Sequence, residues 1–379
     1  MQKINILYII TKLELGGAQR QLLLLIRNLD TTKYNIFLLT SSRGILISEA
    51  LSIGELKLKT IWALDRPINP LKDILAFISI YKFIKKNKID IVHTHSSKAG
   101  ILGRWAAKLA GVKFIFHTVH GWSFHPYQNW LINNLFIFLE KITSLFTDKF
   151  IVVCETDKFR GLLNRVGSEE KYVVIPYAIE LNVTKDIRDD SMKKELGIKD
   201  EDLVIGTISS LKPQKAPWDF VKVAFRVKEN FPRAKFLFIG DGFLRERIER
   251  MVYNYGLKRD FIFTGWRKDI GRILPIIDIF VLTSLWEGVP IAVLEAMALA
   301  KPVVVTDTGG ISEIIKDKFN GFLVRCGDVE KISSIILNLL KDKMLKDMIA
   351  QNAKDSIDSK YNITSMINST QKLYLEVIC

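Results

Sequence analysis

The densest set of reactive side chains in the sequence lies in residues 284–297, where Glu287 and Glu295 stand eight positions apart. Glu287 falls in the loop after a predicted strand, and Glu295 lies about one turn into the helix that follows. Between them, residues 288–293 would present backbone N–H groups at a helix N-terminus, where hydrogen bonds and the helix dipole both favour a phosphate. Ligands of open α/β sheets bind at the carboxyl ends of strands, so this stretch predicts a ligand site. Two glutamates flanking a structural turn are the alternative interpretation.

Two lysines follow another predicted strand. Lys212 and Lys215 lie in the loop of residues 209–217, again just past the carboxyl end of the strand. A lysine in this position acts as a point charge for phosphate and can stabilise the charge that develops on a departing diphosphate. The loop therefore predicts a second phosphate contact, with ordinary solvated lysines as the alternative.

Paired glycines join the first predicted strand to the first predicted helix. Gly16 and Gly17 let the backbone approach a ligand closely, and the start of the helix favours an anion. The pattern G-x-G-x-x-G is absent here. Gly240 and Gly242 also follow a strand, but Arg245 occupies the position of the third glycine, which argues against a nicotinamide dinucleotide site.

All five histidines lie within residues 93–125. On a strand, His93 and His95 would share a face, which is compatible with a zinc site. Asp90 is the only carboxylate in the sequence around them, so we expect no metal. His120 follows a predicted strand, where a single imidazole could contact a substrate.

These side chains need a scaffold, and the hydrophobic pattern supplies it by alternating short β-rich runs with amphipathic helical segments. The predicted strands are 4–10, 35–40, 89–93, 114–119, 150–153, 203–208, 235–239, 261–264, 279–282 and 302–305. The helices predicted in the first half are 18–29, 71–86, 99–110 and 130–146. This order is typical of βαβ units, and it predicts two parallel-sheet domains joined near residues 176–200.

Length and composition agree with a two-domain globular protein. The chain has 379 residues, of which 48% are hydrophobic and 25% charged, and this excludes a disordered or collagen-like protein. Cys154, Cys326 and Cys379 are too few and too far apart for a disulfide framework or a cysteine-based zinc module. The apolar run at residues 4–10 is too short for a signal peptide, so we expect a cytoplasmic protein.

The net charge of +14 is concentrated in the first half, where residues 1–180 hold 24 Lys and Arg against 14 Asp and Glu. Such a charge can attract nucleic acid, anionic lipid or phosphorylated small molecules. Because there is no arginine-rich run and no interleaved aromatic and basic motif, we expect no nucleic-acid partner. Two groups of residues instead predict transient contact with an anionic membrane: Lys82, Lys85, Lys86 and Lys88 beside an apolar helix, and Trp122, Phe124, Tyr127 and Trp130 in a loop. The alternative is that the aromatic residues roof the acceptor cleft and the lysines are simply solvated.

Residues 114–139 contain no Asp, Glu, Lys or Arg, but histidines, a proline and asparagines interrupt the segment, so it does not qualify as a membrane span. The apolar residues in and after it recur at helical spacing: Leu131, Leu135, Phe138, Ile142 and Leu145. We expect this stripe to be buried in the domain core rather than to contact something apolar outside.

Taken together, the motifs resemble the retaining glycosyltransferases of family four, which have the GT-B fold, and most closely those that build bacterial capsule, O-antigen and exopolysaccharide. The resemblance covers nearly the whole chain. It is carried by 16–19 (Gly-Gly-Ala-Gln), 93–104, His120-Gly121, 212–215 (Lys-Pro-Gln-Lys), 239–245, the Glu287 to Glu295 pair and 306–313. It implies Rossmann-like domains at residues 1–180 (acceptor side) and 181–360 (donor side), facing each other across a donor-binding cleft. A C-terminal helix at residues 361–379 would pack back on the first domain.

The resemblance also implies a role for each matching residue. Glu287 would bind sugar hydroxyls and stabilise charge near the reacting carbon, and Glu295 would hold the ribose hydroxyls. Lys215 would grip the diphosphate, and His120 would face the donor sugar. The other residues implied in donor binding are Gly16, Gly17, Lys212, Arg267, Val289, Pro290 and Ile291, with Arg267 near the base.

The implied reaction is transfer of a sugar from a nucleotide-sugar, UDP- or GDP-linked, to a lipid-linked or oligosaccharide acceptor. Such enzymes retain the anomeric configuration and need no cofactor or metal. The protein would be cytoplasmic, with peripheral association at the inner face of the membrane. A non-catalytic basic protein that binds anionic membrane or nucleic acid is the alternative.

Two positions depart from the family pattern. Ser210 stands where an arginine is usual, five residues before Lys215, and Lys212 is the residue that could compensate. Tyr177 and Ala178 follow Pro176 where the family has Asn-Gly, which alters the expected hinge.

Overall fold

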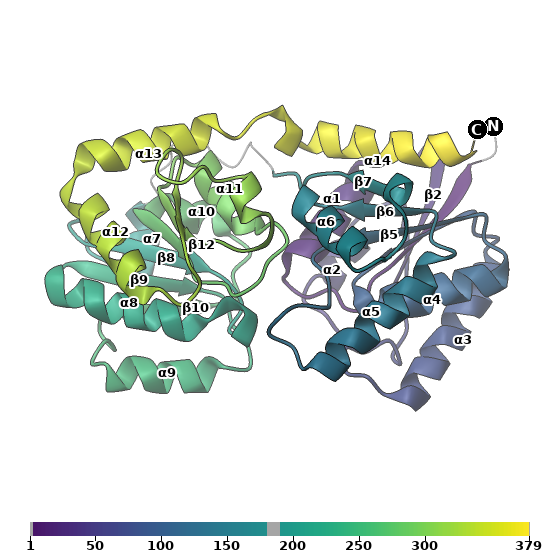
Figure 1. Ribbon diagram of the computed structural model, residues 1–379, viewed down its shortest axis with the longest axis horizontal. Coiled ribbons are helices and arrows are strands. Elements are labelled where there is room, and N and C mark those ends of the chain that lie inside the picture. The colour runs from purple at the N-terminus through teal and green to yellow at the C-terminus, as the bar shows by residue number, and fades with distance from the viewer. Residues whose placement is uncertain (1–2, 180–189, 379) are drawn as a thin grey trace. The chain divides into compact units, whose positions relative to one another are not determined.

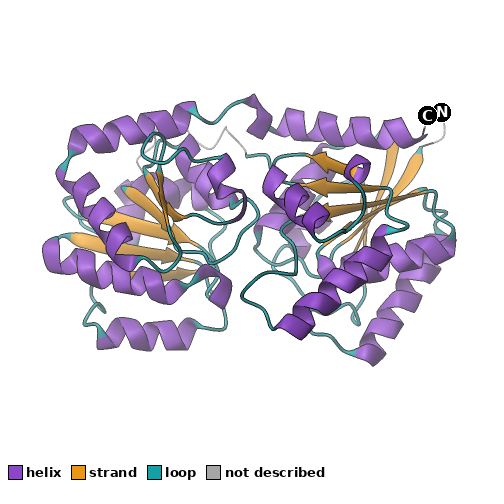
Figure 2. Cartoon of the chain, in the orientation of Figure 1, coloured by secondary structure: helices purple, strands orange, loops and turns teal. Residues whose placement is uncertain are grey.

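The computed structural model describes residues 3–179 and 190–378. The chain forms two compact units, the first made of residues 1–178 with 363–379 and the second of residues 179–362 (Figure 1). Each unit holds one parallel sheet with helices packed around it (Figure 2). This confirms the predicted α/β class with two Rossmann-like parallel sheets.

The first unit contains seven parallel strands. They are β1 (Ile4–Ile9), β2 (Tyr34–Thr40), β3 (Leu56–Thr60), β4 (Ile91–His95), β5 (Phe114–Val119), β6 (Lys149–Val152) and β7 (Tyr172–Val174). Their order in the sheet is β3-β2-β1-β4-β5-β6-β7. The sequence analysis did not predict β3 and β7, the two edge strands: β3 alternates leucine and lysine over five residues, and β7 has only three residues.

The helices of the first unit pack on both faces of this sheet. They are α1 (Gly17–Asn28), α2 (Ile47–Leu51), α3 (Pro70–Lys86), α4 (Ser97–Ala110), α5 (Trp130–Ser144), α6 (Glu155–Leu163) and α14 (Ile363–Ile378). In β1, Ile6 and Tyr8 join the core beneath α1 and α14, whereas Leu7 and Ile9 join the core beneath α3 and α4. Burial on both faces is why the strand is a continuous hydrophobic run.

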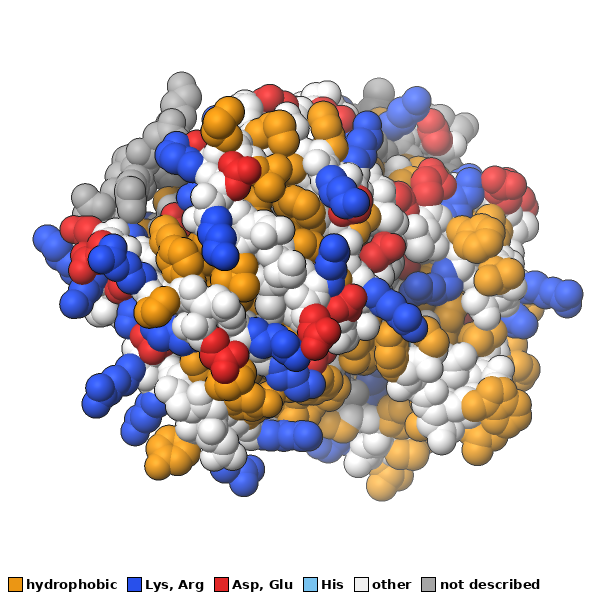
Figure 3. Space-filling model, turned by 60° about the vertical axis from the view of Figure 1, so that its left-hand side comes forward, with side chains coloured by type: hydrophobic (Ala, Val, Ile, Leu, Met, Phe, Trp, Pro, Cys, Tyr) orange, Lys and Arg blue, Asp and Glu red, His pale blue; other side chains and the backbone are white. Residues whose placement is uncertain are grey.

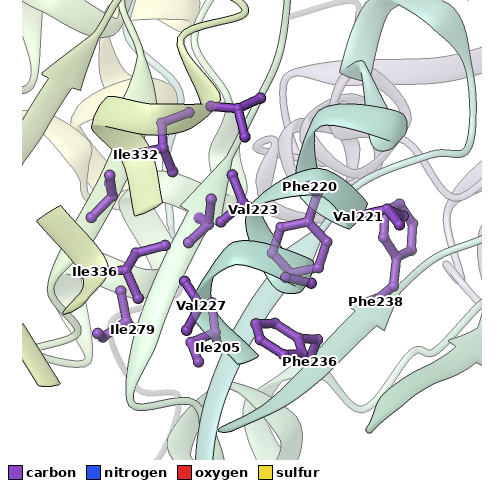
Figure 4. Close-up of a cluster of buried hydrophobic side chains, with 14 of the residues drawn as sticks. Ile205, Phe220, Val221, Val223, Val227, Phe236, Phe238, Ile279, Ile332 and Ile336 are labelled. Carbon is purple, nitrogen blue, oxygen red and sulfur yellow. The ribbon is translucent and has the colours of Figure 1, made fainter. Parts of the chain in front are cut away.

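The second unit contains six parallel strands. They are β8 (Leu203–Ile208), β9 (Ala234–Ile239), β10 (Phe261–Gly265), β11 (Ile279–Leu282), β12 (Val303–Thr306) and β13 (Phe322–Val324), in the order β10-β9-β8-β11-β12-β13. Its helices are α7 (Asp190–Glu195), α8 (Pro217–Asn230), α9 (Arg245–Asn254), α10 (Ile270–Ile273), α11 (Ile291–Ala298), α12 (Val329–Lys341) and α13 (Lys343–Asp355). Its core joins Phe220 of α8 to Phe236 of β9 and Ile332 of α12 (Figure 4).

Both sheets reverse their strand order at one point. In the first unit, the chain leaves β1 toward β2 and later returns to β4 on the other side of β1; in the second, β8 and β11 have the same relation. The loops that follow these strands diverge to opposite faces of the sheet and leave room for a ligand between them. The two pairs of loops are therefore the places where each sheet can build a site.

The predicted buried stripe on α5 is wrong. Leu131, Leu135, Phe138 and Leu145 are exposed, and the helix instead buries Glu140, Thr143 and Ser144. The prediction that four aromatic residues could reach a membrane interface is wrong for two of them. Trp122 and Phe124 are buried, whereas Tyr127 and Trp130 are exposed.

Basic and hydrophobic side chains share much of the visible surface in Figure 3. Among the helices of the described residues, none is long and apolar enough to cross a membrane.

Candidate active site

Lys215 and Glu287 meet at the carboxyl edge of the second sheet. Lys215 ends a short 3₁₀ helix after β8, and Glu287 lies in the loop after β11, so the reversal point of the sheet brings them together. Lys215 Nζ donates to Glu287 Oε1, and the hydroxyl of Ser284 donates to the same oxygen at 2.6 Å. Glu287 is 7% exposed, and the Lys215 side chain is 16% exposed. The pair is therefore largely shielded from water, and the lysine remains partly accessible.

Hydrogen bonds between the two loops fix this pair. The backbone carbonyl of Gln214 accepts a hydrogen bond from the N–H of Leu285, and the side-chain amide of Gln214 donates to the carbonyl oxygen of Trp286. Each of these two bonds is 2.7 Å long. Thr283 Oγ1 donates to the carbonyl oxygen of Lys215 at 3.0 Å. Because these contacts hold the backbone on both sides, the side chains of Lys215 and Glu287 are oriented before any ligand binds.

The loop after β12 supports Glu287 from a third side. Thr306 Oγ1 donates to Ser284 O at 2.5 Å, and the N–H of Gly310 donates to Gly288 O at 2.8 Å. Gly309 has a φ of +60°, and a Cβ at this position would lie 2.0 Å from Glu287 O. Only glycine fits at this position, which gives a structural reason for Gly309.

The helix predicted between the two glutamates is α11. Pro290 is its N-cap, Ile291 begins it, and Glu295 is half-buried on it. Part of the predicted row of N–H donors is absent: Pro290 has no N–H, and the N–H of Val293 donates to Pro290 O at 3.0 Å. Val289 and Ile291 bury their side chains, so a phosphate here could reach only their backbone.

Lys212 and Arg267 differ in their surroundings. Lys212 is half-buried at the start of the 3₁₀ helix that ends at Lys215. The guanidinium of Arg267 is held by Asp269, with bonds of 2.8 and 2.6 Å, and by Glu195 at 2.8 Å. These carboxylates raise the pKa of Arg267, and the pKa of Asp269 is correspondingly lowered.

Gly240 and Gly242 have a structural role. Gly240 has a φ of +137°, and a Cβ there would lie 1.9 Å from Ser209 O, in the loop that leads to Lys215. Leu211 N–H donates to Asp241 O at 2.9 Å. These glycines let the β9 loop lie against the lysine loop.

Gly16, Gly17 and His120 lie at the carboxyl edge of the first sheet. Gly16 is the N-cap of α1, Gly17 is exposed at its first position, and His120 directly follows β5. At the reversal point of this sheet, Thr11 Oγ1 and Ser96 Oγ share a hydrogen bond of 2.8 Å, which ties the β1 loop to the β4 loop.

His120 belongs to a buried network of imidazole and phenol groups. Its Nε2 shares a hydrogen bond of 2.9 Å with His95 Nδ1, and its Nδ1 shares one of 2.7 Å with Tyr177 Oη. His93 bonds Tyr374 through Nδ1 and Thr118 through Nε2. The neighbouring rings of His93 and His95 lie 4.4 Å apart between centroids.

Burial sets the charge state of this network. Loss of hydration lowers the pKa of His93 and of His120 to about 3, and it lowers the pKa values of His95 and His117 well below 6.5. These imidazoles are neutral at physiological pH. His120 can thus donate or accept a hydrogen bond as a neutral ring.

The sequence reasoning missed several members of both sites. Ser284 and Thr306 were inside recognised stretches, and a hydroxyl three residues before Glu287 was a usable signal. Tyr374 gave none, because 281 residues separate it from His93. In the part of the chain that the structure describes, no three or more His, Cys, Asp or Glu side chains are placed so that they could hold a metal ion together.

Two family models match this chain. Residues 15–183 match the model described as Glycosyltransferase Family 4, and residues 188–356 match Glycosyl transferases group 1. A relative from Escherichia coli, "UDP-Gal:alpha-D-GlcNAc-diphosphoundecaprenol alpha-1,3-galactosyltransferase", is 35% identical over 323 residues, covering 83% of this chain and 82% of the relative. The N,N'-diacetylbacillosaminyl-diphospho-undecaprenol alpha-1,3-N-acetylgalactosaminyltransferase of Campylobacter jejuni is 28% identical, covering 82% of this chain and 83% of that protein.

Solved structures share the fold. Anabaena HepE in complex with UDP and glucose has a TM-score of 0.85 at 19% identity, covering 98% of this chain and 99% of that one. The lipopolysaccharide glycosyltransferase WaaG has a TM-score of 0.80 at 14% identity, covering 97% and 99%. The fold is thus that of the GT-B glycosyltransferases. The chain belongs to the family of group 1, family 4 glycosyltransferases, as its motifs indicated.

Proposed function

We propose that this protein transfers a hexose from a UDP-sugar to a lipid diphosphate-linked sugar, with retention of configuration and without a metal ion. The observation that carries the proposal is the Lys215–Glu287 pair at the reversal point of the second sheet. It joins a cation for the donor diphosphate to a carboxylate for the sugar.

Lys215 is suited to the diphosphate because an ammonium has three donors. One of them bonds Glu287, and two remain for phosphate oxygens. Lys212, in the same loop, adds a second cation where family members have an arginine at the position of Ser210. The backbone of Val289 and Ile291 at the start of α11 would complete the phosphate contacts, as the dipole at this helix end favours negative charge.

Glu287 is suited to the sugar because both of its known bonds end on Oε1, so Oε2 takes part in neither. We assign this carboxylate to the sugar hydroxyls and to the positive charge that develops at the anomeric carbon. Glu295 would hold the ribose, Arg267 would lie near the base, and in the first unit Gly16, Gly17 and neutral His120 would contact the phosphates and the sugar.

In the proposed reaction, the bond from the anomeric carbon to the β-phosphate oxygen breaks, and an acceptor oxygen forms its bond on the same face. The proton of the acceptor hydroxyl passes to the departing phosphate oxygen, so the products are the glycosylated acceptor and UDP. Lys215 stabilises the negative charge that grows on that oxygen.

The relatives support the choice of substrates. UDP-Gal and diphosphoundecaprenol stand in the name of the Escherichia coli relative, and UDP is bound in HepE. We therefore favour UDP over GDP and a lipid-linked over a free oligosaccharide acceptor. Surface polysaccharide synthesis at the inner face of the membrane is the setting that follows.

The test is a transfer assay with a panel of UDP- and GDP-hexoses and synthetic N-acetylglucosaminyl-diphosphate lipids of short and long chain. We expect transfer from a UDP-hexose and an α-linked product by NMR. A β-linked product from an α-linked donor would contradict retention, and no transfer from any nucleotide-sugar in the panel would contradict the proposed function.

A further inference from the structure

Helix α5 has its hydrophobic face directed outward. Leu131, Leu135 and Phe138 recur at intervals of four and three residues, so they share one helix face. Leu131 is 67% exposed and Phe138 is 57% exposed. An ordinary surface helix buries such a stripe.

Polar contacts fix this orientation. On the inward side of α5, Glu140 forms an ion pair of 2.6 Å with Arg104 of α4, and Thr143 Oγ1 accepts from the indole N–H of Trp105 at 3.1 Å. Rotating the helix to bury its leucines would expose or break these buried bonds. The outward apolar face is thus a built feature of the fold.

Helix α3 continues the same surface. Leu71, Ile74 and Leu75 are exposed on one side of α3, with Leu71 at 76%, while the opposite side buries Ala76 and Ile80. Helix α4 packs against both α3 and α5, and the three helices lie together in Figure 1. We name the outward face of α3, α4 and α5 the apolar face.

The charges around the apolar face are positive. Exposed lysines lie at the ends of two of its helices: Lys82, Lys85, Lys86 and Lys88 at the end of α3, and Lys108 and Lys113 at the end of α4. The carboxylates in this stretch are occupied. Asp73 pairs with Lys98, Glu140 pairs with Arg104, and Asp90 accepts from Asn5 N–H.

We propose that the apolar face docks onto a bilayer that contains anionic phospholipid, with its leucines and Phe138 entering the headgroup region and its lysines contacting lipid phosphates. The charge favours an anionic bilayer over a second copy of this chain, because a second copy would bring the same positive charge to this face. The inference deepens the proposed function, on which its biological meaning rests, by naming the surface that would bring the enzyme to a lipid-linked acceptor.

The test is flotation of the full chain with vesicles of phosphatidylcholine alone or with phosphatidylglycerol, at low and high salt. We expect binding only with phosphatidylglycerol and weaker binding at high salt. The triple variant Leu131→Ser, Leu135→Ser, Phe138→Ser should reduce vesicle binding about 10-fold or more, and so should Lys85→Glu with Lys86→Glu.

The matched control is Lys331→Glu with Lys341→Glu on α12, which makes the same change in net charge on the second unit. This control should bind vesicles more strongly than the variant of Lys85 and Lys86. Equal losses in both pairs would overturn the surface assignment. Loss of a dimer in the triple variant, with vesicle binding intact, would show that the face binds a second copy.

Transfer to the short-chain acceptor separates this inference from the proposed function. All these variants should retain it, because none touches the Lys215 site. A wild-type protein that transfers sugar but does not bind anionic vesicles would refute only the docking surface. One that binds vesicles but transfers nothing would refute only the function.

Discussion

The Arg104–Glu140 pair of the first unit and the Lys215–Glu287 pair of the second differ in how completely their hydrogen-bonding groups are satisfied. In the first unit, Arg104 is fully buried and bonds Glu140, Gly100 O and Thr147 Oγ1, with its guanidinium over the ring of Phe150. In the second unit, Lys215 remains partly accessible beside Glu287. The first pair holds two helices together, and the second is the pair to which we assign the donor.

The position in each fold explains this difference. Arg104 and Glu140 join two helices on the side of the sheet, whereas Lys215 and Glu287 follow β8 and β11 at the sheet reversal. A pair between helices is enclosed by packing. A pair at the carboxyl ends of strands stays open to substrate, because the loops there diverge.

The largest expected effect is on stability, in the first unit. Arg104→Ala leaves Glu140 as a buried, uncompensated charge and should lower the free energy of unfolding by about 3–5 kcal/mol in denaturant titration. The matched control is Arg226→Ala, which removes an exposed pair with Glu330 and should cost about 1 kcal/mol or less. Equal losses would contradict the comparison.

The next largest expected effects are on turnover and UDP affinity, in variants of the two glutamates of the second unit. Glu287→Ala should lower kcat about 100-fold with little loss of UDP affinity, because its contacts are assigned to the sugar. Glu295→Ala should do the reverse and weaken UDP about 10-fold by calorimetry, because its contacts are assigned to the ribose. If both variants lost UDP affinity equally, these assignments would be wrong.

The histidine network predicts a smaller effect on pH dependence. His93 and His120 have folded-state pKa values of about 3, and histidine in an unfolded chain titrates near 6.5. Below about pH 6.5 the unfolded chain therefore binds protons that the folded chain does not, and stability falls as pH falls toward 3. Each histidine contributes about 1.4 kcal/mol per pH unit in that range.

Denaturant titration at pH 7.5, 6.5 and 5.5 measures this slope. His93→Gln should reduce the loss between pH 6.5 and 5.5 by about 1 kcal/mol relative to wild type, because the unfolded histidine is only half protonated at pH 6.5. An unchanged slope would show that His93 already carries a proton in the folded protein.

The sequence predicted the inner strands and the Lys215 and Glu287 loops well, since buried parallel strands are continuous apolar runs and site loops follow their ends. It did not predict the outward face of α5. Helical spacing shows that apolar residues share a face but not which way the face points. Here Arg104, 36 residues before Glu140, decides the orientation.

The buried histidine network could not be predicted from the local sequence, because it also depends on residues far away in the chain. The histidines were visible as a cluster, but their neutral state results from burial, and only the folded chain brings Tyr374 of α14 and Tyr177 to them.

We propose that Lys215, held in place by Glu287, does the work at the donor diphosphate for which other enzymes use a metal ion. The most direct test is the initial rate of transfer from a UDP-hexose to the short-chain lipid acceptor, measured in excess EDTA and in magnesium. We predict the same rate in both, and a loss of UDP affinity in Lys215→Ala that magnesium does not restore. Transfer abolished by EDTA and recovered with magnesium would contradict the account.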